Sequence, residues 1–203
     1  MDIDALETVE SLREKTDATA AAVRRLNASV AISVALLATF MAICKVKDDN
    51  IVQAMQQAQA HMIDNWGFYQ ARNIRQEIAE SNVMQLEVVR SGMPATADKT
   101  GIDKMIAAQQ EQAKSQESKK ADLKKQAEDN SKQYDDLNFV DDQFDLSDAL
   151  LAIAVALMAM TALTELWWLF FVALVPTFFG VLMGLSGLLG WGIHPDALTK
   201  LLS

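Results

Sequence analysis

A run of 19 residues without a charge, from Leu26 to Cys44, constrains this chain more than any other feature. A helix of that length rises roughly 28 Å, close to the hydrocarbon thickness of a bilayer. Two further apolar runs follow at 146–164 and 166–193, and Asp148 is the one charge within them. We therefore expect an integral membrane protein with three transmembrane helices, at residues 26–45, 146–164 and 166–193.

The stretch between the first two spans, residues 46–145, is polar and poor in helix breakers. Gly67 is the only glycine before Arg90, and no proline occurs there. A turn signal follows near residues 91–101, where Ser91-Gly92-Met93-Pro94 stands. A seam of residues at three- and four-residue spacing predicts a helix on each side of that turn; it is mostly apolar on the first side and partly polar on the second. We expect an all-α fold, with a long antiparallel helical hairpin resembling a coiled coil outside the bilayer. The predicted seam of the first arm is Ile51, Met55, Ala58, Met62 or Ile63, Trp66, Tyr69 or Gln70, Ile74 and Ile78. The predicted seam of the second arm is Ile102, Met105 or Ile106, Gln109, Ala113, Gln116, Lys120, Leu123, Ala127, Asn130, Tyr134 and Leu137.

The two ends of the chain have their own predicted roles. Residues 1–25 are mixed in charge with apolar residues at helical spacing, which predicts an amphipathic segment. Residues 194–203 are short and amphipathic, which predicts an interfacial tail. Four basic residues precede the first span (Arg13, Lys15, Arg24 and Arg25) and two follow it (Lys45 and Lys47), so the N-terminus is predicted to be cytoplasmic and the hairpin periplasmic.

Small residues recur along the spans at intervals of three and four. Such residues let helix backbones approach closely in lipid. In the third span they are Gly180 and Gly184. We expect the first two spans to pack on each other through their alanines and the whole chain to self-associate. The alanines are Ala31, Ala35 and Ala38 in the first span and Ala152 and Ala156 in the second.

The first arm carries an aromatic motif, Trp66-Gly67-Phe68-Tyr69-Gln70-Ala71, followed by Arg72-Asn73-Ile74-Arg75-Gln76. Together with the order of one span, a polar hairpin and two closing spans, it resembles the bacterial family catalogued as domain of unknown function 4337. The resemblance implies a bacterial inner-membrane protein and brings no activity. In one respect the chain departs from the family pattern: the turn between the last two spans is acidic at Glu165 rather than basic.

Trp66, Tyr69 and Gln70 allow two interpretations. In the first, they form an intermolecular contact, which either fixes the register of neighbouring protomers or receives a partner protein. In the second, they form an ordinary layer of large residues inside the hairpin. Ile74, one turn further on, belongs to the same predicted packing set.

Acidic residues are dense where both arms meet the membrane. Asp48 and Asp49 follow the first span, and Asp135, Asp136, Asp141, Asp142, Asp145 and Asp148 approach the second. Asp141, Asp145 and Asp148 fall at i, i+4 and i+7, on one face of a continuing helix. In a ring of subunits they would form the anionic vestibule of a cation pore. In the simpler interpretation they are hydrated acids at a membrane exit, and Asp148 caps the span.

Several function classes are disfavoured by the sequence. The net charge of −9 argues against nucleic-acid binding. Cys44 is the only cysteine, and no nucleophile–base set, phosphate loop or metal-ligand spacing occurs, so we expect neither an enzyme nor a bound cofactor or metal. The predicted function is a homo-oligomeric structural or scaffolding assembly in the lipid bilayer. The alternatives are a cation channel and an adaptor subunit that serves an unidentified protein partner.

Overall fold

The computed structural model describes residues 5–193, with side chains from Glu10 onward, and this range holds three helices and no strand. The helices are α1 (Ala5–Gly92), α2 (Thr100–Thr164) and α3 (Trp167–Leu189). The prediction of an all-α fold is confirmed. The chain divides into a first unit, residues 1–52 with 138–203, and a second unit, residues 53–137. The predicted interfacial tail at 194–203 lies outside the described residues.

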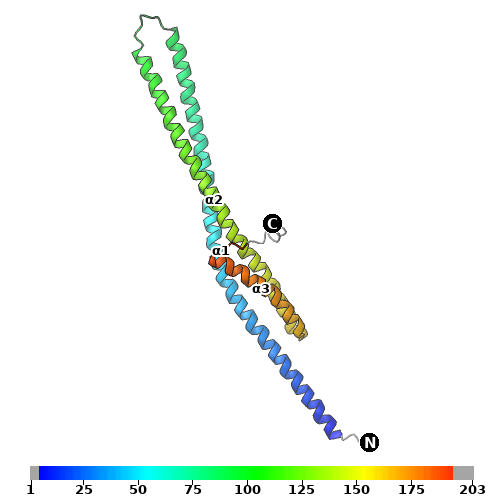
Figure 1. Cartoon of the computed structure of the whole chain (residues 1–203). Coiled ribbons are helices and arrows are strands. Elements are labelled where there is room, and N and C mark those ends of the chain that lie inside the picture. Colours follow the sequence, from blue (N-terminus) through cyan, green and yellow to red (C-terminus); the bar gives the residue numbers. More distant parts are fainter. Residues whose placement is uncertain (1–4, 194–203) are drawn as a thin grey trace. The chain divides into compact units, whose positions relative to one another are not determined.

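In the first unit, all three helices pack together (Figure 1). Each helix includes a segment long and apolar enough to cross a membrane. Large apolar side chains also cover the outside of this unit, including Ile32, Leu36, Phe171 and Phe178. An apolar interior together with an apolar exterior is typical of helices surrounded by lipid. The buried core consists of Leu26, Val30 and Leu37 from α1, Leu151, Ala154 and Met158 from α2, and Ala173 from α3.

The connection between α2 and α3 is a tight turn at Glu165. Its backbone has a φ of 57°, in the left-handed region, and its N–H donates to the carbonyl of Thr161. The turn therefore lies where the acidic interruption of the apolar runs predicts it. α3 ends earlier than the predicted span, because Gly190 adopts a φ of 68° and terminates the helix. Pro176 lies inside α3 without ending it.

In the second unit, α1 and α2 run side by side and antiparallel, joined by the loop at residues 93–99 (Figure 1). Buried and half-buried residues together recur at three- and four-residue intervals on each helix. The predicted seam of α2 is confirmed, because Ile106, Gln116 and Ala127 are all buried.

The predicted seam of α1 is only partly right. Met55 and Ala58 are buried as expected, but Ile74 and Ile78 are each 56 % exposed, and Ala79 is buried instead. The physical reason is the helical period: continuing the three–four alternation beyond Tyr69 leads to Arg72, Gln76 and Ala79, so the seam becomes polar.

Candidate functional site

The glycines of α3 form the closest helix–helix approach in the first unit. A Cβ added at Gly180 would lie 2.8 Å from Leu151 Cγ, and one added at Gly184 would lie 2.7 Å from the Phe40 ring and 2.8 Å from Ser147 Oγ. Ser147 Oγ also donates a hydrogen bond of 2.8 Å to the carbonyl of Gly180. The two predicted packing glycines therefore seat α3 directly on α2 and α1.

The predicted alanine stripes of α1 and α2 do not lie in the contact between the helices. Ala31, Ala35 and Ala38 of α1 and Ala152 and Ala156 of α2 are all exposed in the single chain. Within one chain, the expectation that these stripes pack on each other is wrong. Larger side chains such as Leu37 and Leu151 fill the contact instead, because they bury more apolar area and bring more dispersion contacts.

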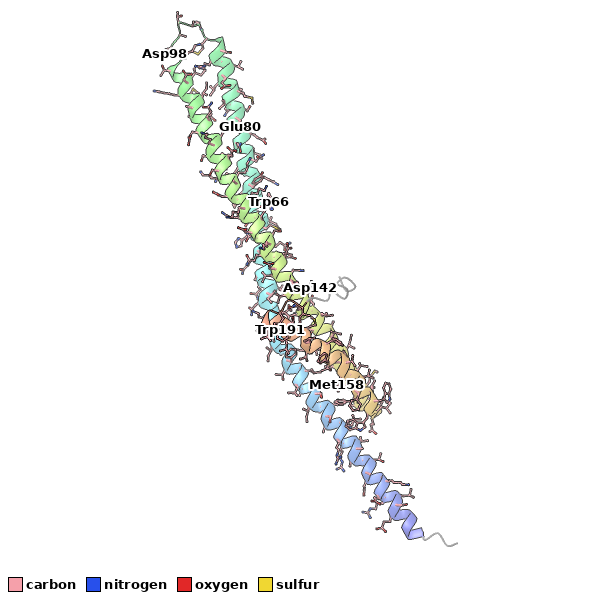
Figure 2. All side chains as sticks on the ribbon, viewed as in Figure 1. Trp66, Glu80, Asp98, Asp142, Met158 and Trp191 are labelled. Atoms are coloured by element: carbon pink, nitrogen blue, oxygen red, sulfur yellow. The ribbon has the colours of Figure 1, made fainter. Side chains whose placement is uncertain are left out.

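The aromatic motif of the second unit joins its two helices through polar contacts. Trp66 and Tyr69 are half-buried, and their rings meet edge to face with centroids 5.4 Å apart. Lys120 Nζ from α2 lies 5.8 Å from the centre of the Tyr69 ring and donates to Asn73 Oδ1 at 2.9 Å. Figure 2 labels Trp66 on this part of α1.

Further polar pairs cross between the same helices. Arg72 Nη1 donates to Gln116 Oε1 at 3.0 Å, and Asn82 Nδ2 lies 3.4 Å from Gln109 Oε1. Gln70 and Ile74, two residues of the predicted packing set, take no part in this seam and are exposed. Trp66 and Tyr69 therefore belong to the hairpin interior, and the other two belong to its surface.

The carboxylates Asp141, Asp145 and Asp148 lie together in the first unit, beside Asp48 of α1. Asp48 was not among the predicted site residues, yet its side chain is only 6 % exposed. Its Oδ2 accepts a hydrogen bond of 2.8 Å from Lys45 Nζ. Its position could have been found from the heptad that places Met41, Asp48 and Met55 on one face of α1.

Crowding of these carboxyl groups changes their acidity. Burial, a hydrogen bond with Asp48 and the charge of Asp145 raise the pKa of Asp141 to about 7. Burial of its carboxyl and the charge of Asp48 also raise the pKa of Asp145, although that residue as a whole is exposed. Asp148 lies on the exposed side of the cluster. Between residues 5 and 193, no three His, Cys, Asp or Glu side chains have a geometry that could hold a metal ion.

Gln143 is a second residue absent from the predicted set. It is fully buried, and its Nε2 donates to the carbonyls of Trp191 and Ile193 at 2.8 and 2.7 Å. Figure 2 shows Trp191 close to Asp142, the residue before Gln143. The amide thus ties the chain that follows α3 to the side of α2. Nothing in the local sequence signals this role, because it depends on where α3 ends.

Residues 26–190 match the family described as a domain of unknown function (DUF4337). The matched range includes the motif at 66–76, so the predicted resemblance is confirmed. No curated protein and no solved structure matches the chain.

Proposed function

The chain belongs to the family described as a domain of unknown function (DUF4337), and we propose that it is a non-enzymatic membrane scaffold whose copies assemble through the second unit. In this proposal the first unit anchors the protein in a bacterial inner membrane with its N-terminus in the cytoplasm. The hairpin of the second unit stands outside the bilayer on the periplasmic side. The observation that carries the proposal is an exposed, uncharged face of α1 within the hairpin.

We call this face the outer stripe. At 100° per residue its members fall within an arc of roughly 80° on the helix. No Lys, Arg, Asp or Glu of that part of α1 falls in the same arc; Glu77 and Asp64 flank it. Ile63 is 60 % exposed and Val88 71 % exposed, so a single chain leaves the stripe uncovered. The outer stripe consists of the exposed residues Ile63, Gly67, Gln70, Ile74, Ile78, Gln85 and Val88, together with half-buried Ser81.

A second copy of the same stripe is the occupant that fits it best. The other helix of the hairpin is rich in exposed Lys, Asp and Glu, and Met105 is its one strongly exposed large apolar residue among positions 100–137. That charged surface offers no complement to an apolar stripe. Two uncharged stripes bring no repulsion to their contact, and each covers the other's apolar side chains.

The contact area of the stripe is small, so it favours assembly of copies that are anchored in the same membrane over dimerisation in solution. From Ile63 to Val88 it spans roughly 38 Å of helix, one side chain wide, which is less area than a standard soluble dimer buries. Anchored copies share one orientation and a confined layer, which raises their effective concentration. The exposed alanines Ala31, Ala35 and Ala38 provide a further close-approach surface on the membrane part of α1.

The test is the number of copies in the detergent-purified protein, measured by native mass spectrometry. We expect a defined oligomer for the wild type. The double variant Ile74→Lys/Ile78→Lys should lose it, because the two lysine ammonium groups of each copy would be buried against the same groups of the other copy. Met105→Lys is the matched control, since Met105 is 57 % exposed on the other helix. A monomeric wild type, or a double variant that assembles like the control, would refute the proposal.

A further inference from the structure

The side chain of Asp48 is buried, and one of its carboxylate oxygens has no hydrogen-bond donor within the described part of the chain. Its side chain is 6 % exposed, and Lys45 occupies only one of its two oxygens. The other, Oδ1, has no hydrogen-bond donor among the described groups. A buried acceptor left without a donor is strongly unfavourable, and more so when it carries charge.

Asp141 is the neighbouring carboxyl group that can offer Asp48 a proton. It stands on α2 within hydrogen-bonding reach of Asp48. Two ionised carboxylates only accept hydrogen bonds, so a bond between them requires that one of them hold a proton. Carboxyl pairs in this arrangement retain one shared proton, because both cannot ionise at close range.

The surroundings favour the protonated form. The other titratable groups near the pair are Cys44, Lys45 and Asp49 on α1 and Asp142, Asp145 and Asp148 on α2. Lys45 is the one cation among them, and it is shared with Asp49 at 3.4 Å. α3 adds no charge, since the segment from Trp167 to Leu189 contains no charged residue.

A cavity of about 20 Å³ lies beside Asp48 and is lined in part by Lys45, Asp145 and Asp148. This volume is enough for one water molecule. Asp145 and Asp148 are exposed, so the cavity beside Asp48 is bordered by residues that contact the solvent.

We propose that Asp48 and Asp141 form a proton-binding site, and that the shared proton fastens α1 to α2 in the first unit. The site is a pH-sensitive latch: it is closed when the proton is bound and loosens when the proton leaves. The latch does not depend on the assembly proposed above, because both carboxyl groups belong to one chain.

The direction of the pH effect follows from Asp141. Its pKa is raised to about 7 in the folded chain from an ordinary value of 3.8. The folded protein therefore holds a proton that the unfolded chain releases, and its stability falls as the pH rises from about 4 to about 7. The thermal midpoint of the first unit should be several degrees higher at pH 5 than at pH 8.

The direct test is infrared difference spectroscopy of the full chain in liposomes, following the C=O stretch of protonated carboxyl groups. We expect a band that disappears with a midpoint near pH 7 and is absent in Asp141→Asn. In Asp48→Asn the midpoint should shift downward, because residue 48 no longer carries a negative charge and its new amide can donate to ionised Asp141. Asp135→Asn, an exposed aspartate of the second unit, is the control and should leave the band unchanged.

Stability provides an independent readout. In the Asp141→Asn variant the new side-chain amide would donate to Asp48 at every pH, so this variant should keep its low-pH thermal midpoint at pH 8. The proposal fails if no protonated-carboxyl band exists between pH 5 and 7. It also fails if the band persists in Asp141→Asn, or if that variant keeps the pH dependence of the wild type.

Discussion

The close seat of α3 allows a quantitative prediction for the variant Gly184→Ala. The added methyl group would lie 2.7 Å from the Phe40 ring and 2.8 Å from Ser147 Oγ. Carbon atoms in contact prefer 3.5–4.0 Å, so either the Phe40 ring or the helix itself must move by about 1 Å. Ser147 cannot rotate away without losing its hydrogen bond to Gly180.

The magnitude is the balance of two effects. Overpacking of a well-packed contact costs about 1–3 kcal/mol. Replacing a helical glycine by alanine returns up to about 1 kcal/mol. We therefore expect Gly184→Ala to destabilise the first unit by about 1–2 kcal/mol, which raises the open fraction roughly 5- to 30-fold.

Cys44 is a built-in reporter of that opening, because it is the only cysteine in the sequence and its side chain lies in the same helix contact, only 6 % exposed. The assay is the labelling rate of Cys44 by a fluorogenic maleimide in detergent at fixed pH. The control is Gly101→Ala in the second unit, the same chemical change with nothing within 4 Å of the new Cβ. The control should keep the wild-type rate. If Gly184→Ala also keeps it, α3 does not pack on α1 and α2 as closely as described.

Two further predictions concern residues that join helices. Gln143→Leu removes the two hydrogen bonds to the carbonyls of Trp191 and Ile193, at a cost of about 1–3 kcal/mol. Amide hydrogen exchange at residues 190–193 should therefore accelerate about tenfold or more, while exchange along the α1 seam should stay unchanged. Equal exchange in variant and wild type would show that the amide does not hold this segment. Trp66→Ala removes a half-buried ring and should cost about 1–3 kcal/mol, less than a fully buried Trp, in thermal unfolding followed by circular dichroism. Phe68→Ala, with a side chain 60 % exposed, is its control, and equal melting of the two variants would contradict the contact with Tyr69.

The helices and turns could be predicted from the sequence because their signals are local. Uncharged runs mark the apolar segments of α1 and α3, and Gly92 and Pro94 mark the end of the first arm. Glu165 likewise marks the second turn. The seam of α2 follows from spacing, although Gln116 in it is polar.

The errors arise where hydrophobicity and helical period disagree. Ile74 and Ile78 look like core residues, yet the period established by Met55 and Ala58 places Arg72, Gln76 and Ala79 in the seam. The alanines of the spans have the spacing of a packing face, but their spacing does not say which helix, if any, packs against that face. The burial of Asp48 and Gln143 was not predicted for the same reason, since it depends on helices distant in sequence.

The unbroken course of α1 and α2 restricts how chains of this family can change in length. Inserting one residue into either helix turns everything beyond it by roughly 100° and moves the seam to the wrong side. Insertions of seven residues, matched in both helices of the hairpin, restore the facing positions. The loop at 93–99 is free of this restriction. Length differences among family members should therefore be spread freely through that loop and come in paired heptads everywhere else in the second unit.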